Sequence, residues 1–166
     1  MKRLLELIYP RRAVCMGCGS MLGCERDDIC DECREKLAGD WIGVRSLDGN
    51  SGLDGASFAY GYQGVGGNLV RRLKYGSVRV LAEEMASDIA KAAELLRVDH
   101  ADFITAVPMH PKRLRGRGHN HGELLAKIAA EKLNLPFCMA LMRKRNDPQQ
   151  VRLNDEQRRK NHPLNH

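Results

Sequence analysis

Hydrophobic residues recur at every third or fourth position in two segments of the chain, and this period predicts two amphipathic helices. Residues 80–96 carry one set on a single face: Leu81, Met85, Ile89, Ala92 and Leu96. Residues 121–133 carry the other: Leu124, Leu125, Ile128, Ala129 and Leu133. Asn120 is placed to cap the second helix, and Asn68 to cap a shorter helix that ends at Tyr75. Weaker patterns predict helices over residues 1–9 and 154–161.

Three short apolar segments predict strands, at residues 56–62, 102–107 and 137–142. Strands that alternate with helices of this length are typical of a parallel sheet with right-handed crossover connections, so the predicted fold class is α/β. The basic, glycine-containing segment from Pro108 to Asn120 is predicted to be a loop at the carboxyl end of a strand, where such folds bind ligands. The loop suits a phosphate or pyrophosphate group, and a solvated basic loop is the alternative.

Four cysteines form two Cys-x2-Cys pairs, Cys15 with Cys18 and Cys30 with Cys33, and Gly17 and Gly19 allow the backbone to bend around the first pair. Two such pairs complete a closed tetrahedral Zn2+ site, which is structural because no coordination position stays open. Residues 13–38 contain too little apolar surface to fold alone, so the metal would supply the missing stability. We place a zinc module at residues 1–42, a linker at residues 43–55 and a second domain at residues 56–166.

Alternatives to zinc are a pair of disulfides or an iron–sulfur cluster. Cys24 lies between the two pairs and could replace a ligand, although a bystander thiol is the simpler interpretation. Cys138 lies in an apolar strand, which favours a buried, inert thiol.

Positive charge is concentrated in the carboxy-terminal part of the chain. The net charge of +6 divides into −1 for residues 1–100 and +7 for residues 101–166. A positive field suits nucleic acid or a phosphorylated metabolite as a partner, and a solvated basic surface is the alternative. No segment has the apolar length of a signal peptide or a membrane helix, so we expect a cytoplasmic protein without membrane insertion. Disulfides are rare in that compartment.

Several further motifs follow the cysteine pairs in a fixed order: Leu73-Lys74-Tyr75, Val107-Pro108, Arg113 to Asn120, Leu124-Leu125-Ala126, Gln150 to Leu153, Arg158 and Asn161. In order and spacing the chain resembles the ComF family of phosphoribosyltransferase-like proteins, which is associated with bacterial competence for DNA uptake. The resemblance runs from residue 15 to about residue 161. It implies a zinc-ribbon-like module followed by a Rossmann-like, type I phosphoribosyltransferase sheet with flanking helices.

The resemblance also implies a substrate and its contacts. Lys74 and the Val107-Pro108 loop would lie near the pyrophosphate of phosphoribosyl pyrophosphate, with Arg113 and Arg117 as further anionic contacts. Mg2+ would accompany this substrate in an active enzyme.

Two positions depart from the family pattern. His119 stands where an aromatic residue is usual, and His121 where glutamine is usual. We interpret both as solvated or phosphate-facing, and a His-x-His metal site is the alternative.

One segment of the resembled fold is absent from the sequence. Phosphoribosyltransferases hold the ribose hydroxyls and the 5′-phosphate with paired acidic residues followed by hydroxyl residues and glycine. The only Asp-Asp pair here, Asp27-Asp28, lies in the cysteine module. Residues 55–166 also number only 112, against roughly 150 for a five-stranded crossover sheet. We therefore expect an incomplete, carboxy-terminally truncated sheet that does not bind phosphoribosyl pyrophosphate tightly.

Two functions remain open at this point. The leading hypothesis is a ComF-like protein linked to DNA uptake or utilisation, with partners in the competence machinery and without surviving transferase activity. The alternative is a zinc-dependent protein that binds single-stranded nucleic acid or acts as a scaffold. Against it, Phe137 is the last aromatic residue of the chain, so the basic part lacks interleaved aromatic residues for base stacking.

Overall fold

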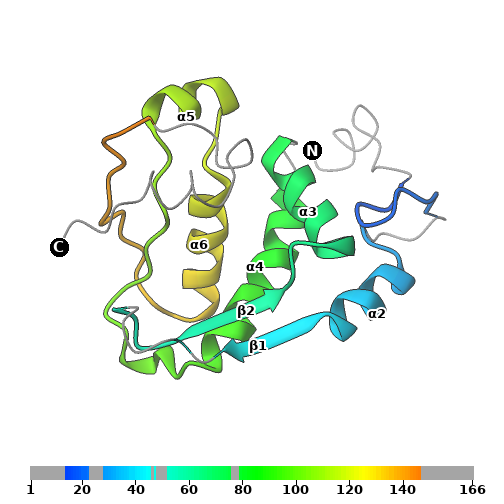
Figure 1. Cartoon of the computed structure of the whole chain (residues 1–166), viewed down its shortest axis with the longest axis horizontal. Coiled ribbons are helices and arrows are strands. Elements are labelled where there is room, and N and C mark those ends of the chain that lie inside the picture. Colours follow the sequence, from blue (N-terminus) through cyan, green and yellow to red (C-terminus); the bar gives the residue numbers. More distant parts are fainter. Residues whose placement is uncertain (1–13, 23–27, 46, 48–51, 76–78, 147–166) are drawn as a thin grey trace, which may run out of the picture.

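The computed structural model describes residues 14–22, 28–45, 47, 52–75 and 79–146, which form a mixed arrangement of helices and strands (Figure 1). The elements are α2 (Asp31–Gly39), β1 (Trp41–Arg45), β2 (Ala56–Tyr60), α3 (Gly64–Tyr75), α4 (Arg79–Glu94), the 3-10 turn η1 (Val98–His100), α5 (Pro111–Arg117) and α6 (His121–Lys132). None of these helices combines the length and apolar character needed to span a bilayer.

β1 and β2 form a two-stranded antiparallel sheet that connects α2 to α3 (Figure 1). The register places Trp41 opposite Tyr60 and Gly43 opposite Phe58. The predicted strand at residues 56–62 is therefore confirmed as β2, but its partner is β1, which begins in the predicted module and ends in the predicted linker. α4 packs against β2, so the hairpin is covered by a helix on one side.

The described residues do not show the predicted Rossmann-like parallel sheet. The two other predicted strands meet at a single parallel bridge between Ile104 and Phe137. Ile104 N–H donates to the Pro136 carbonyl at 2.8 Å, and Cys138 N–H donates to the Ile104 carbonyl at 2.9 Å. The ladder then stops, because the next inward N–H, that of Ala140, donates to the Thr105 side-chain hydroxyl at 3.2 Å and to the Cys138 carbonyl of its own segment at 3.0 Å, and not to a backbone carbonyl of the facing segment.

The two strongly periodic helices are confirmed. α4 and α6 match the predicted segments to within two residues at each end and pack against each other. The predicted N-cap of α6 is also confirmed, since Asn120 Oδ1 accepts a hydrogen bond from Gly122 N–H at 3.1 Å. The helices predicted at residues 1–9 and 154–161 lie outside the described residues.

Two local predictions are wrong. α3 begins at Gly64, one turn before the predicted cap Asn68, because Val65 continues the buried stripe of Leu69 and Leu73 towards the amino terminus. The predicted loop after Pro108 contains α5, which begins at Pro111 and is capped by His110, whose Nδ1 accepts from Lys112 N–H at 3.2 Å. Gly118 ends α5 with a φ of 83°, a left-handed conformation that favours glycine.

One hydrophobic core joins the cysteine-rich segment to the helices. It is formed by Cys15, Met16, Ile29, Cys33, Leu37, Val65, Leu69, Leu73, Leu81, Ala82 and Met85. The first five belong to the predicted zinc module, and the others to α3 and α4. The module therefore buries its apolar side chains against α3 and α4, which supplies the core that its own sequence lacks.

Candidate metal centre and basic site

The first cysteine pair lies on a short hairpin turn. Val14 and Met21 form an antiparallel bridge, Cys15 N–H donates to the Ser20 carbonyl at 2.7 Å, and Gly19 N–H donates to the Cys15 carbonyl at 2.9 Å. These bonds bend the backbone so that both thiols of the pair are on the same side. Cys15 is fully buried, whereas Cys18 is exposed and its Sγ lies 3.2 Å from Ser20 Oγ.

The second pair lies at the amino terminus of α2. Cys30 is the N-cap residue, and Cys33 lies in the first turn, where it is buried. The free N–H groups and the helix dipole at this end favour negative charge, but burial outweighs them at Cys33 and raises the pKa of its thiol. The start of the helix thus fixes the spacing of the second pair, as the hairpin turn does for the first.

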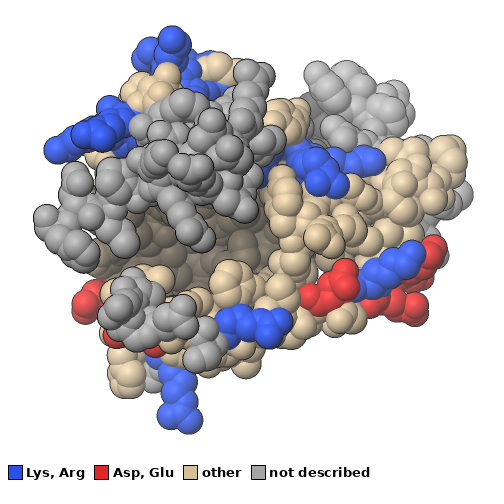
Figure 2. Space-filling model, in the orientation of Figure 1, with Lys and Arg blue, Asp and Glu red and all other residues tan. Residues whose placement is uncertain are grey.

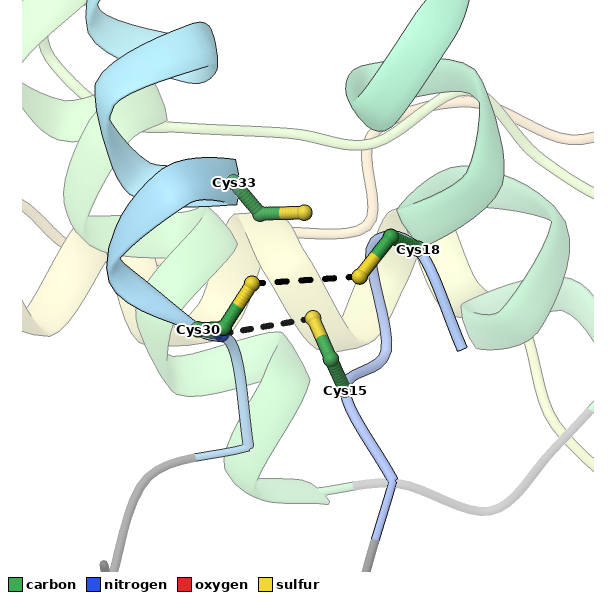
Figure 3. Close-up of side chains that lie close together, drawn as sticks. All are labelled: Cys15, Cys18, Cys30 and Cys33. Carbon is green, nitrogen blue, oxygen red and sulfur yellow. Dashed lines mark hydrogen bonds between the residues drawn. The ribbon is translucent and has the colours of Figure 1, made fainter. Parts of the chain in front are cut away.

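The four sulfur atoms point towards a common centre (Figure 3). All four Sγ atoms lie within 4.8 Å of one another, and those of Cys18 and Cys30 are 3.8 Å apart. A tetrahedral zinc ion with Zn–S bonds of ~2.3 Å separates its sulfur ligands by ~3.8 Å. The set of donors and their spacing are therefore compatible with one structural Zn2+ ion, as the sequence predicted.

The spacing also bears on the alternatives to zinc. The cysteines are free, and the separation of 3.8 Å between Cys18 and Cys30 far exceeds the ~2.05 Å of a disulfide. A cluster of several irons binds its cysteines through different metal atoms, which spreads the sulfurs more widely than one ion does. Cys24, the remaining candidate ligand, lies outside the described residues. A single ion held by the four predicted cysteines fits best.

The thiols differ in how readily they ionise. Burial raises the pKa of Cys15, but hydrogen bonds from the backbone N–H groups of Cys30, Cys18 and Gly17 outweigh burial and lower it to about 6. The Ser20 hydroxyl, which hydrogen-bonds to its sulfur, lowers the pKa of Cys18. Burial, followed by the neighbouring thiols, raises the pKa of Cys33. A bound cation would stabilise all four thiolates together.

α3 holds the first pair from outside. Asn68 Nδ2 donates to the Gly17 carbonyl at 2.7 Å, and this bond connects the turn between the two ligands of the first pair to the middle of the helix. A Cβ atom at Gly17 would lie 2.7 Å from Cys33 Sγ and 2.9 Å from the Val65 side chain. Glycine is therefore required here by the close approach of α2 and α3.

A second candidate site forms where the carboxyl end of α3 meets the connection between α5 and α6. His119 Nε2 lies 3.3 Å from the Leu73 carbonyl. Burial, followed by the positive charges of Lys74, Arg117 and His119, lowers the pKa of His121 to about 4. Lys74, Arg117 and His119 thus all lie close enough to act on His121, and we call these four groups the basic site.

The basic site contains two of the predicted phosphate contacts, Lys74 and Arg117. Neither forms an ion pair with any of the described acidic residues, so their charges are not neutralised by neighbouring carboxylates. His121 is half-buried, and its Nδ1 is buried without a hydrogen-bond partner among the described residues. The histidines that depart from the family pattern are therefore part of the site and are not simply solvated.

The other predicted contacts, Val107, Pro108 and Arg113, lie beside the basic site in sequence. Val107 is exposed, and its carbonyl accepts from Asn120 Nδ2 at 3.4 Å, which connects the Val107-Pro108 loop to the start of α6. Arg113 lies on the middle of α5 and is partly exposed. Cys138, predicted to be buried, is exposed, because the parallel ladder ends beside it.

Two exposed tyrosines beside the basic site were missed by the sequence reasoning. Lys74 Nζ lies 5.0 Å from the ring centroid of Tyr62, and the Arg117 guanidinium lies 5.5 Å from that of Tyr75. Tyr75 is 79% exposed. Figure 2 shows Lys and Arg side chains over α5 and over α3, whereas acidic side chains lie near α2. The position of Tyr75 next to Lys74 in the motif Leu73-Lys74-Tyr75 was the one sequence signal that aromatic rings lie beside these cations.

Comparison with known proteins adds no further assignment: no protein-family model, curated protein or solved structure matches this chain.

Proposed function

We propose that this chain is a ComF-like, phosphoribosyltransferase-related protein in which a structural zinc centre supports a phosphate-binding basic site. The observation that carries the proposal is that the end of α3 lies against His119 and that Lys74 and Arg117, 43 positions apart in the sequence, both act on His121. The single parallel bridge at Ile104 supports a crossover through α6 that puts the basic segment at the end of a strand. A Rossmann-like sheet and a role in DNA uptake remain part of the proposal.

The zinc centre acts in this proposal as a support, because four thiolates leave no coordination position for a substrate. Purified protein should contain about one zinc per chain by elemental analysis. Cys33→Ser should release the metal and unfold the segment around it, whereas Cys138→Ser, a matched control at an exposed cysteine, should retain both. A metal-free wild-type protein with full stability would contradict the structural role of the metal. If elemental analysis found one iron per chain, iron would take the place of zinc in the proposal.

The basic site binds an anion through charge and hydrogen bonds. Lys74 offers a point charge and Arg117 a planar pair of donors, which suits the oxygens of a phosphate group. His121, kept neutral by burial and by its cationic neighbours, has an unpartnered Nδ1. A phosphate dianion beside the ring would favour the imidazolium form, so His121 would gain a proton as the anion binds.

A transferase reaction would use the site only at its leaving-group end. The acceptor nitrogen forms a bond to the anomeric carbon of the ribose while the bond from that carbon to the pyrophosphate oxygen breaks, and the cations stabilise the departing pyrophosphate. Mg2+ does not fit the four groups of the site, since none is a carboxylate or another oxygen ligand. We derive no step through that metal.

Titration with inorganic pyrophosphate tests the anion site. Calorimetry at low salt should detect binding that weakens by about tenfold in Lys74→Gln and in Arg117→Gln, because each loses a charge-assisted contact. Lys132→Gln, at the far end of α6, is the matched control and should bind as the wild type does. Phosphoribosyl pyrophosphate should bind no more tightly than pyrophosphate, because the basic site contacts only that end of the molecule. No binding to the zinc-loaded wild type would contradict the proposal.

A second candidate function, binding of single-stranded nucleic acid, is favoured by the exposed tyrosines. Tyr62 is 55% exposed and Tyr75 79% exposed, and each has a Lys or Arg over its ring. Exposed aromatic rings between cations are the usual means of stacking bases without sequence preference. Tyr62 and Tyr75 thus bring to the basic site the aromatic rings that the basic carboxy-terminal part of the sequence lacks.

Binding of labelled oligothymidylate separates the two functions. Affinity should fall steeply with salt, and Tyr75→Ala should weaken it by roughly tenfold while leaving pyrophosphate binding unchanged. Tyr9 lies outside the described residues and is therefore not used as a control. Phe58→Ala, which removes an exposed ring on β2, is the better control. Affinity that is independent of Tyr75 and of salt would remove this candidate.

A further inference from the structure

A pocket of about 480 Å3 lies between α2, the β1–β2 hairpin and α4. Trp41 and Tyr60 line it from the hairpin, and Glu84, Ser87, Asp88 and Lys91 line it from α4. The volume lies in the range of ~300–1,000 Å3 that small-molecule sites occupy. The pocket is separate from the basic site and shares no residue with the cysteine cluster.

One wall of the pocket is aromatic. Trp41 and Tyr60 are directly opposite each other in the antiparallel register, so their side chains lie on the same face of the hairpin. Trp41 is 37% exposed, and neither aromatic side chain has a hydrogen-bond partner within the described part of the chain. The two rings therefore form a surface that can stack against a ligand, with the indole N–H and the phenol hydroxyl available to it.

The opposite wall is polar where a helix facing a sheet is normally apolar. Ser87, Asp88 and Lys91 lie three, four and seven positions after Glu84, so the four residues form one stripe of α4. The core stripe of the same helix, with Leu81 and Met85, is turned elsewhere. Packing against β2 does not account for the polar stripe. A charged ligand bound between α4 and the hairpin would account for it.

Two cations, Arg34 and Lys91, and two carboxylates, Glu84 and Asp88, line the pocket, and the carboxylates are the less exposed of the four side chains. Glu84 pairs with Arg34, and their side chains are 28% and 39% exposed. Asp88 pairs with Lys91 at 3.3 Å, but the lysine is 67% exposed against 25% for the aspartate. An exposed pair contributes little, so a ligand can replace Lys91 beside Asp88 at low cost. Burial raises the pKa of Tyr60, and the charges of Asp88 and Glu84 raise it further, in agreement with a negative field at the phenol.

We propose that this pocket binds a small organic cation, an amine or amidine with a flat apolar body. The cationic group would lie between Asp88 and Glu84, and the apolar body would lie against Trp41 and Tyr60. Carboxylates give the cation a charge partner, and the aromatic faces attract the same charge through their quadrupoles. This assignment does not depend on anion binding at the basic site.

Three probes with one ring test the sign of the charge. Trp41 is the only tryptophan of the chain, so its fluorescence in the zinc-loaded full chain reports the pocket directly. Benzylammonium should bind at least about tenfold more tightly than benzyl alcohol, which has the same body without the charge. Benzoate should not compete with it. Equal affinity for the cation and the alcohol, or preferential binding of benzoate, would overturn the proposal.

Two variants of α4 locate the effect. Asp88→Asn keeps the shape of the side chain but removes its charge, and should weaken benzylammonium binding by about tenfold without changing the affinity for benzyl alcohol. Glu83→Gln, next to the pocket but not lining it, should bind as the wild type does. Circular dichroism and zinc content should match in both variants. Unchanged affinity in Asp88→Asn, or equal losses in the two variants, would overturn the proposal.

Discussion

The Asn68 side chain connects α3 to the turn of the first cysteine pair by a hydrogen bond. Its Nδ2 donates to the Gly17 carbonyl at 2.7 Å, and its Oδ1 accepts from Arg71 at 2.7 Å. Asn68→Ala should lower the free energy of unfolding by ~1–2 kcal/mol, because the partly buried carbonyl loses its donor. Urea unfolding of the zinc-loaded protein measures the loss. Arg71→Ala removes two exposed contacts, with Asn68 and with the Tyr62 ring, and should change stability by no more than ~0.5 kcal/mol, so equal losses would contradict the assignment.

His121 makes stability depend on pH. Its pKa is lowered from 6.5 to about 4 in the folded chain, by burial and then by the charges of Lys74, Arg117 and His119. Between these two values the unfolded chain binds a proton that the folded chain does not, so stability falls as pH falls from 6.5 towards 4. The ring is only half-buried, and solvent screening reduces the contribution to the order of 1–2 kcal/mol.

The contribution of His121 is measured as a difference between two proteins. His121→Gln removes the titrating group, so its stability should fall less than that of the wild type over the same pH interval. Protonation of the cysteine ligands affects both proteins alike and cancels in the comparison. Parallel pH profiles would show that His121 does not carry the effect. An NMR titration of the ring checks the pKa directly, and added pyrophosphate should raise it.

At the scale of elements, the start of α6 depends on Asn120, which is 8% exposed. Its Oδ1 caps Gly122 N–H at 3.1 Å, while its Nδ2 donates to the Val107 carbonyl at 3.4 Å. Asn120→Ala should cost ~1 kcal/mol or more in thermal or urea unfolding. Asn120→Asp keeps the cap and loses only the longer bond to an exposed residue, so it should retain most of the stability. A loss in Asn120→Asp as large as in Asn120→Ala would mean that the contact with Val107 matters more than the cap.

Elements with a buried stripe could be predicted from the sequence, and the others could not. α4 and α6 bury regular apolar positions, and their periods were visible. α5 buries no residue, so it has no pattern, although Pro111 and Gly118 marked its two ends. β1 is mostly exposed and is defined by its pairing with β2, a partner that its own residues do not indicate.

The candidate sites divide in the same way. The cysteine cluster was predictable because each pair is local, and the two-residue spacing alone restricts where the thiols lie. The gathering of Lys74 and Arg117 around His121 depends on how the end of α3 lies against the connection between α5 and α6, and only a family resemblance suggested it. Tyr62 and the pocket beside Trp41 had no sequence signal, since tertiary packing creates both.

For the whole molecule, the shared core means that the metal centre and the helices stabilise each other. Leu69 and Leu73 of α3 are each 1% exposed and belong to the same cluster as Cys15 and Cys33. A metal that binds the folded chain and not the unfolded chain stabilises everything that unfolds with it. The cysteine-rich segment therefore should not melt as a separate unit.

Leu69→Ala tests whether the metal centre and the helices unfold together, because Leu69 lies in α3, far from the cysteine ligands in sequence. The substitution leaves a cavity in the common core and should cost ~2–5 kcal/mol. If the core is one cooperative unit, zinc release to a coloured chelator and the loss of helical circular dichroism should move together to a lower temperature. Leu95→Ala, at a side chain that is 52% exposed, is the matched control and should shift neither signal. The contrary outcome is that the helices of Leu69→Ala melt early while zinc release stays at the wild-type temperature. That result would show that the cysteine centre unfolds as an independent unit, and it would support the predicted boundary between module and domain.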